Sequence, residues 1–176
     1  MYQDFKDLLS AFNARSVRYL IVGGYAVSFH GQPRATKDID IFIKADSANA
    51  KAVFAALASF GASLAGITPD DLSNPRQFIR FGREPVAFDI LPGIDGVDFD
   101  AAWERRVESV IDTASGLKAF FISKEDLIAS CRLSNSTPAP RMLPCGFLSF
   151  HSPASLRSRT AGLGFIENRS SSGYSA

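Results

Sequence analysis

The sequence predicts an α/β (α+β) fold in which helices flank a mixed β-sheet. Two short apolar runs, residues 19–22 and 38–43, have the branched, apolar composition of buried strands. Residues 3–14 and 47–60 instead carry apolar side chains at helical spacing. Helical and strand-like segments alternate along the chain, and this order is typical of a sheet with helices packed against it.

Length and composition bound the class of protein. A chain of 176 residues predicts one domain with its own core. A formal charge of +1 argues against bulk electrostatic binding of nucleic acid, although a local basic groove stays open. The chain has no run of 18 apolar residues and its first residues do not resemble a signal peptide, so we expect no membrane span. With only Cys131 and Cys145, no disulfide framework is expected, and a cytoplasmic location follows.

The elements outside the central stretch follow from periodicity and turn residues. The first helix should cover the sheet with Phe5, Leu8, Leu9 and Phe12. Ser47 is the expected cap of the helix over residues 47–60, and Gly61 its stop. Residues 62–76 are polar and rich in turn residues, so they are expected to form a loop.

The second half of the chain predicts a hairpin and further short elements. Residues 77–81 and 86–91 read as its two strands around a turn at 82–85. After it we expect a short helix over 99–107 and two strands over 107–111 and 117–122. Ser123 and Asp126 then fit a capping box that opens a final helix.

Two aspartates lie within the central strand. Asp38 and Asp40 share one face because side chains alternate along a strand, and their Cα atoms should lie roughly 6.5–7 Å apart. Neighbouring carboxylates at the end of an apolar sheet repel each other and lose hydration. A divalent cation such as Mg²⁺ bound between them would remove both costs. The alternative is a solvated strand end whose acids face water.

A glycine pair precedes these aspartates. Gly23 and Gly24 separate the first strand from a short helical segment over residues 25–30. Such a turn lets the backbone approach a ligand closely, and free N–H groups at the helix start can face a phosphate. The pattern is neither a Walker P-loop nor a dinucleotide fingerprint, because Gly-Lys-Ser/Thr and Gly-x-Gly-x-x-Gly are both absent.

The joint motif resembles the nucleotidyltransferase superfamily that includes DNA polymerase β. Its signature is Gly-Gly or Gly-Ser, a short helix, then Asp-hydrophobic-Asp on a strand, and Gly23, Gly24, Asp38 and Asp40 match it in order. The run from Arg34 to Asp40 is similar to the Arg-x-Thr-x-Asp-hydrophobic-Asp form of small bacterial members, namely minimal nucleotidyltransferases and abortive-infection toxins. The resemblance covers residues 1–130.

Asp89 stands alone in an otherwise apolar strand. An unpaired acid there is costly, so it either faces water on an edge strand or has a partner. The family carries a third acid on a later strand, and the resemblance implies this position for Asp89. Its role would be to bind the catalytic metal and help deprotonate an acceptor hydroxyl. Asp95, Asp98 and Asp100 are rivals, but they follow in a loop where solvated acids are ordinary.

The resemblance implies a reaction. A nucleoside triphosphate would lie with its phosphates on Gly23 and Gly24, while Asp38, Asp40 and Asp89 would hold two Mg²⁺ ions. An acceptor hydroxyl would attack the α-phosphorus, and pyrophosphate would leave. Arg34, Thr36 and Lys37 are candidate phosphate contacts, although a basic loop can equally be solvated; His30 is expected to pack or face solvent. The acceptor is left open among an RNA 3′ end, a protein hydroxyl and a small molecule.

Two alternatives to this enzyme are kept. One is a catalytically impaired nucleotide-binding component of a toxin–antitoxin pair, with a cognate antitoxin as partner. The other is a metal-dependent glycosyltransferase that uses Asp-x-Asp, against which the preceding glycine pair argues.

The chain changes character after residue 130. Residues 131–176 are rich in Ser, Pro and Arg, and the helical pattern of the preceding segment stops at Cys131. This composition predicts an irregular or disordered tail behind a domain of residues 1–130. We interpret the tail as an altered or frame-shifted end, with a basic nucleic-acid-binding arm as the alternative.

Overall fold

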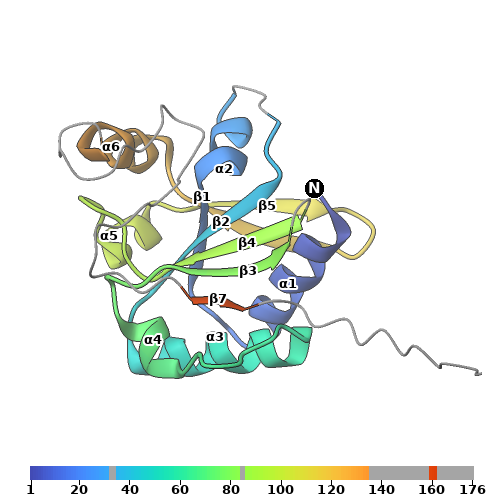
Figure 1. Cartoon of the computed structure of the whole chain (residues 1–176). Helices are drawn as coiled ribbons and strands as arrows, with labels where there is room; N and C mark the ends of the chain where they lie inside the picture. The colour runs from blue at the N-terminus through green and yellow to red at the C-terminus, as the bar shows by residue number, and fades with distance from the viewer. Residues whose placement is uncertain (32–34, 84–85, 135–158, 162–176) are drawn as a thin grey trace, which may run out of the picture.

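A mixed β-sheet forms the centre of the molecule, and helices lie around it (Figure 1), as predicted. The computed structural model describes residues 1–31, 35–83, 86–134 and 159–161. In this part of the chain the strand order is β5-β6-β1-β2-β4-β3-β7. The strands are β1 (Tyr19–Val22), β2 (Asp38–Ile43), β3 (Ile79–Arg83), β4 (Val86–Leu91), β5 (Val107–Asp112), β6 (Leu117–Phe121) and β7 (Arg159–Ala161).

Six helices surround this sheet in the described residues. None of them is long and apolar enough to cross a membrane. The first helix and the strand that carries the two aspartates have the predicted bounds. The helices are α1 (Gln3–Ala14), α2 (Gly23–Phe29), α3 (Ser47–Phe60), α4 (Pro69–Ser73), α5 (Phe99–Glu104) and α6 (Lys124–Ser134).

One face of the sheet is apolar and carries α1 and α3. The register aligns Ile21 with Ile41 and Ile41 with Ile90, so these side chains share a face. From α1, the Phe5 ring lies 5.4 Å from the ring of Phe88 on this face. From α3, the ring of Phe60 lies 5.5 Å from the same Phe88 ring. Figure 1 shows these two helices side by side, and their burial of aromatic area supplies much of the core.

The opposite face carries the acids, and we call it the acidic face. Asp38, Asp40 and Phe42 alternate with the isoleucines of β2 and therefore point away from α1 and α3. The short helix α5 covers the far end of this face, where the Phe99 ring lies 5.0 Å from the Phe42 ring. Aromatic packing from α5 therefore covers one end of the acidic face. The aspartates lie toward the other end.

Several predicted element boundaries were wrong. The helix over residues 47–60 is capped by Asp46, whose side chain accepts a hydrogen bond from the Asn49 N–H, and not by Ser47. Residues 62–76 are not all loop, because α4 forms there behind a capping box between Thr68 and Asp71. Proline at the first helical position and two acids in the first turn favour this helix.

Later boundaries also differ. The first hairpin strand runs over 79–83 and not 77–81, so Gly82 and Arg83 belong to the strand and not to the predicted turn at 82–85. Residues 84–85 lie outside the described residues. The short helix ends at Glu104 and not at residue 107. The last helix continues past Cys131 to Ser134, so the helical pattern does not stop where the sequence predicted. Of the predicted tail, only residues 131–134 and 159–161 are described.

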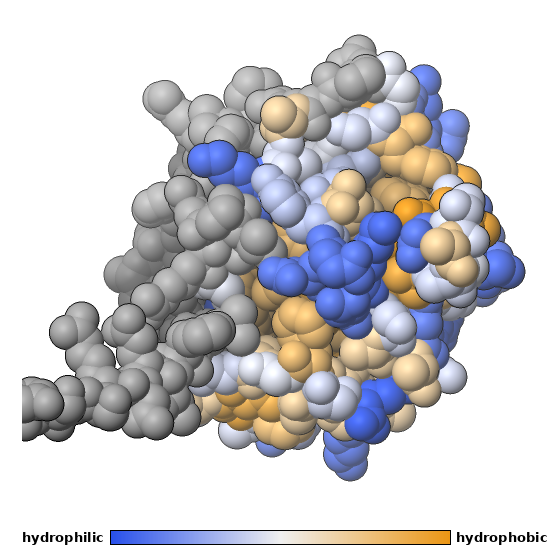
Figure 2. Space-filling view, turned by 90° about the vertical axis from the view of Figure 1, so that its right-hand side faces the viewer, coloured by the Kyte–Doolittle hydropathy of each residue, from blue (hydrophilic) through white to orange (hydrophobic). Residues whose placement is uncertain are grey.

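The surface mixes polar and apolar residues. On the face drawn in Figure 2, strongly hydrophilic residues gather near the centre and hydrophobic residues lie around them. The large hydrophobic side chains that are exposed in the described residues are scattered over the N-terminus, α2, β5 and α6, and such single exposures are ordinary. They are Met1, Tyr2, Phe29, Val107, Val110 and Ile128.

Candidate active site

Three aspartates meet on the acidic face at adjacent strands. Asp38 and Asp40 come from β2, and Asp89 comes from β4, which runs parallel to β2 beside it. Asp40 is the direct register partner of Asp89, so both carboxylates project to the same side of the sheet. The prediction that the strand of Asp89 lies beside that of Asp38 and Asp40 is therefore confirmed, and β4 is not an edge strand because β3 pairs with its other side.

The turn into α2 is built around Asp40. Gly23 begins this helix with a φ of +60°, a conformation that favours glycine. A Cβ at this position would lie 2.0 Å from Oδ2 of Asp40. Any side chain at residue 23 would therefore both strain the backbone and push the Asp40 carboxylate away.

The second glycine packs against the segment that leads into β2. Gly24 does not adopt a positive φ; instead a Cβ there would lie 2.9 Å from the side chain of Thr36. Its N–H donates a hydrogen bond to the Asp40 carboxylate, so this amide already has an acceptor. The glycine pair thus brings the start of α2 against β2 and holds Asp40 in place.

Arg80 joins the three aspartates, and sequence reasoning missed it. It lies on β3 directly opposite Asp89 in the antiparallel register. Its Nη2 donates to Oδ2 of Asp38 at 2.5 Å, and its Nε lies 3.3 Å from Oδ1 of Asp89. One guanidinium therefore bridges carboxylates from two strands. A signal existed in the sequence: a lone cation in one apolar hairpin strand and a lone acid in the other.

Burial makes two of the carboxylates weak acids. Desolvation raises the pKa of Asp40 well above its usual value, and the charges of Asp89 and Asp38 raise it further. The Gly24 N–H and Arg80 offset part of this shift. Burial likewise raises the pKa of Asp89 to about 7, against the lowering effect of Arg80, while Asp38 raises it. Paired, shifted acids of this kind are typical of functional sites.

One oxygen of this cluster is left without a donor. Oδ1 of Asp89 is buried and makes no hydrogen bond within the described residues, although Nε of Arg80 is its ion-pair partner. The Asp89 side chain is only 3% exposed, whereas those of Asp38 and Arg80 are 30% and 39% exposed. A buried acceptor without a hydrogen-bond donor, next to the partly exposed Asp38 carboxylate, is suited to a ligand that supplies positive charge.

The comparison with protein families agrees with this geometry. Residues 2–138 match the model of a family described as "Nucleotidyltransferase of unknown function (DUF6036)". The chain belongs to this family. No curated protein matches the sequence. The family match confirms the resemblance read from the glycine pair and the aspartates, and it extends beyond residue 130, where the resemblance was expected to end.

The acids of this nucleotidyltransferase have the donor chemistry for a magnesium ion. Asp38, Asp40 and Asp89 offer hard carboxylate oxygens, and Oδ1 of Asp89 lacks a hydrogen-bond donor. As the side chains lie, however, no group of three or more His, Cys, Asp or Glu residues in the described part of the chain is arranged to hold a metal ion. Two of the three acids are instead paired with Arg80.

The other predicted site residues are placed less directly. Thr36 packs beside Gly24, and its hydroxyl donates to the backbone carbonyl of Asp38, so it fixes the loop before β2. Lys37 is exposed at the start of that strand. Arg34 lies outside the described residues. His30 is structural, as expected, since its Nε2 is 2.7 Å from the carbonyl oxygen of Ile122 and donates to it.

The rival acids have other partners or face water. Asp98 caps α5 by accepting from the Ala101 N–H. Asp100 pairs with Lys44 at 2.9 Å and with Arg18. Asp95 is exposed. Only Asp89 among these later acids projects beside Asp40.

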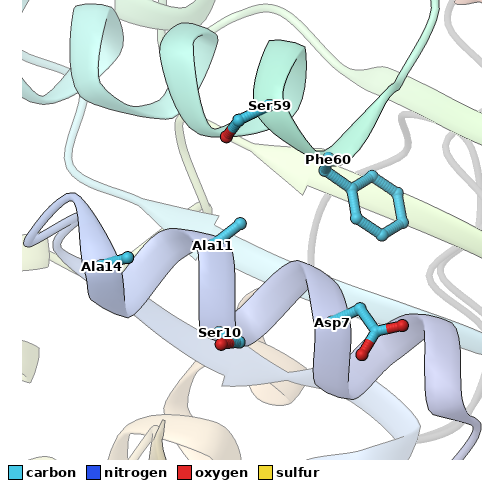
Figure 3. A pocket seen from close by; sticks show the side chains of 6 residues that line it. All are labelled: Asp7, Ser10, Ala11, Ala14, Ser59 and Phe60. Carbon is cyan, nitrogen blue, oxygen red and sulfur yellow. The ribbon is translucent and has the colours of Figure 1, made fainter.

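A groove of about 450 Å³ lies elsewhere, between α1 and α3. Figure 3 shows its side chains coming from these two helices, which cover the apolar face of the sheet. Its one charged group, Asp7, accepts a hydrogen bond from the side chain of Gln3. The groove therefore brings no cluster of chemical groups together and lies across the sheet from the acids. It is lined by Asp7, Ser10, Ala11, Ala14, Ser59 and Phe60.

Proposed function

We propose that this family member transfers a nucleoside monophosphate from a nucleoside triphosphate to an acceptor hydroxyl, with release of pyrophosphate. The observation that carries the proposal is the pairing of Asp40 with Asp89 on adjacent parallel strands, with Asp38 on the same face. Three carboxylates on one face of a sheet repel one another unless cations lie among them, and their hard oxygens are ligands that Mg²⁺ accepts. The family match supports the reaction class.

In this mechanism the acids bind cations and move a proton. Asp38, Asp40 and Asp89 would hold Mg²⁺, which when bound neutralises charge on the triphosphate and on the leaving pyrophosphate. The acceptor oxygen forms a bond to the α-phosphorus as the bond from that phosphorus to the bridging oxygen breaks. The acceptor's proton passes toward Oδ1 of Asp89, which has no hydrogen-bond donor in the described residues.

The surrounding chain orients these groups. The Gly24 N–H donates to the Asp40 carboxylate and holds it in place. The Thr36 hydroxyl donates to the carbonyl oxygen of Asp38 and so holds the backbone at the start of β2. Lys37 and Arg34 are proposed phosphate contacts from the loop that precedes this strand. Acids fixed on strands, with the exposed Lys37 just before β2, suit a site that must admit a substrate and then hold it.

A labelling experiment tests the proposal. The protein is incubated with Mg²⁺ and each α-³²P-labelled nucleoside triphosphate, together with RNA, protein or small hydroxyl acceptors in separate reactions. We expect label on one acceptor class and one pyrophosphate for each label transferred. An Asp40→Asn variant serves as the negative control, because it keeps the shape of the side chain but removes its charge.

The alternatives predict other products. A glycosyltransferase would release a nucleoside diphosphate from a nucleotide sugar and no pyrophosphate from a triphosphate. An impaired nucleotide-binding protein would bind the triphosphate but release no pyrophosphate with any acceptor. Added acceptor would leave the number of triphosphates bound per protein unchanged. Either pattern would contradict the proposed reaction.

A further inference from the structure

Arg80 occupies an unusual place for a cation in this site. Its guanidinium reaches from β3 across to β2 and contacts Asp38 on one strand and Asp89 on the other. It therefore lies among the carboxylates that the proposed function assigns to Mg²⁺. In the described residues it is the basic side chain that pairs with these acids.

The two contacts of Arg80 differ in burial. Asp38 is 30% exposed and Arg80 39% exposed, so the bond between them is reached by solvent and costs little to break. Asp89 is 3% exposed, so its charged form is favoured only when a cation lies nearby. Arg80 can therefore leave Asp38 at little cost. It can leave Asp89 only if another cation replaces it there.

The guanidinium is also suited to a second kind of partner. Its planar donors match the oxygens of a phosphate as well as those of a carboxylate. A nucleoside triphosphate brings both a divalent cation, which the acids prefer, and phosphate oxygens, which arginine prefers. Arrival of such a substrate would offer each group in the cluster a new partner of opposite charge.

We propose that Arg80 is an exchangeable counter-cation: it pairs with Asp38 and Asp89 in the substrate-free protein, yields these carboxylates to a divalent cation, and then binds a phosphate of the nucleotide. This inference rests on the proposed function, because it assumes that the triphosphate binds at the acids. Arg80 would thus link cation binding to triphosphate binding at this site.

The test compares two affinities in an Arg80→Gln variant. Free Mn²⁺ is measured by electron paramagnetic resonance, and binding of the α,β-methylene analogues of ATP, CTP, GTP and UTP is measured by calorimetry with Mg²⁺ present. We expect Mn²⁺ alone to bind at least fivefold more tightly, because its competitor is gone. The best analogue should bind at least tenfold more weakly, because a phosphate contact is lost.

A gain in Mn²⁺ affinity together with a loss in analogue affinity distinguishes this role of Arg80 from a structural one. If Arg80 only held the carboxylates in position, both affinities would fall together, and that result would overturn the proposal. Unchanged affinities would overturn it as well. Arg15→Gln is the matched control, since Arg15 is exposed at the C-terminal end of α1, where its Nε donates to Oγ of Ser59. This control should change neither affinity.

A second measurement uses the wild-type protein, so it tests the proposal even if the Arg80→Gln variant unfolds. The ¹⁵Nε resonance of Arg80 is followed by NMR during titration with Mg²⁺ and then with the analogue. We expect one shift when Mg²⁺ displaces the guanidinium and a second shift when phosphate binds. A resonance that does not move at saturation would contradict the exchange. If the wild type binds no analogue at all, the proposed function fails instead.

Discussion

At the scale of single residues, Asp40 and Asp89 have an energetic cost in the metal-free protein. Both are buried, and desolvation raises the pKa of each. Oδ1 of Asp89 also has no hydrogen-bond donor in the described residues. A protein keeps such groups where their charge is needed for binding or chemistry.

Replacing Asp40 with Asn should therefore separate stability from activity. The amide keeps an oxygen for the Gly24 N–H but removes a buried charge that Asp89 and Asp38 repel. We expect nucleotide transfer to be lost and the free energy of unfolding of the metal-free protein at pH 8 to rise by about 1–3 kcal/mol. Urea denaturation measures the second effect; wild-type turnover in Mg²⁺ would rule out the assignment of Asp40.

Gly23→Ala should damage both the fold and the site. The added Cβ would lie 2.0 Å from the Asp40 carboxylate in a backbone with φ of +60°. We expect a loss of more than about 2 kcal/mol in the free energy of unfolding, from strain and from the displaced acid. Gly61→Ala is the control for strain alone, because its φ is +90° and nothing lies within 4 Å of its Cβ position. Equal losses in the two variants would argue against contact with Asp40.

The sequence predicted some of these residues and not others for a physical reason. Asp89 was predictable because an acid in an apolar strand requires a partner, and β2 supplies its neighbour. Arg80 was missed because its pairing depends on hairpin register. With the turn at residues 82–85, Arg80 would face Ala87; the observed register places it opposite Asp89.

At the scale of elements, polar side chains fasten the ends of strands and helices. Asn49 on α3 is buried and bonds the backbone of Arg18 and Lys44, which flank β1 and β2. It thereby ties the ends of the two central strands to one helix. Asp126 fastens the start of α6 in a similar way: it bonds Arg105 and Ser123, and its own N–H donates to Ser123 Oγ.

The Asp126 contacts predict a pH dependence of stability. Arg105, and then Ser123, lower the pKa of Asp126 in the folded protein. A lowered folded pKa means that the stabilisation is fully present above the unfolded value of about 3.9 and is lost as pH falls through the folded value. The difference in unfolding free energy between wild type and Asp126→Asn should thus be constant from pH 7 to 5 and shrink below about pH 4. A difference that persists at pH 2 would contradict this, and Asp95→Asn, at an exposed loop acid, should show none.

The sequence patterns predicted some helices and strands correctly and missed others. The amphipathic α1 and the apolar β1 and β2 were predictable because tertiary packing agrees with their periodicity. The helix α4 was missed because Pro69 and two aspartates indicate a turn as readily as a helix start. The continuation of α6 to Ser134 was missed because composition changes at Cys131 before the helix ends.

At the scale of the whole molecule, the sheet divides packing from chemistry. The face under α1 and α3 carries aromatic core residues, and the acidic face carries Asp38, Asp40 and Asp89. Figure 1 shows where the two helices lie relative to the sheet. The parallel pairing of β2 with β4 places Asp89 next to Asp40, although the two residues are 49 positions apart in the sequence. No local pattern could specify that pairing, and only the lone acid and the family resemblance indicated it.

A divalent cation should therefore stabilise the whole fold. A ligand that binds only the native state raises the unfolding free energy by RT ln(1 + [L]/Kd), which is about 2.7 kcal/mol at 100 times Kd. We expect Mg²⁺ to raise the melting temperature of the wild type by several degrees and to leave that of Asp40→Asn within about one degree. Differential scanning calorimetry checks this, and an equal shift in both proteins would indicate binding elsewhere.

The central claim is that Asp89 completes a nucleotidyl-transfer site with Asp38 and Asp40. The most direct test is single-turnover transfer of α-³²P label by wild type, Asp89→Ala and Asp95→Ala, with triphosphate affinity measured in parallel. We predict that Asp89→Ala slows transfer by roughly a thousandfold, about 4 kcal/mol of transition-state stabilisation. Its triphosphate affinity should change less than tenfold, and the exposed control should match the wild type. Transfer by Asp89→Ala at the wild-type rate would contradict the claim.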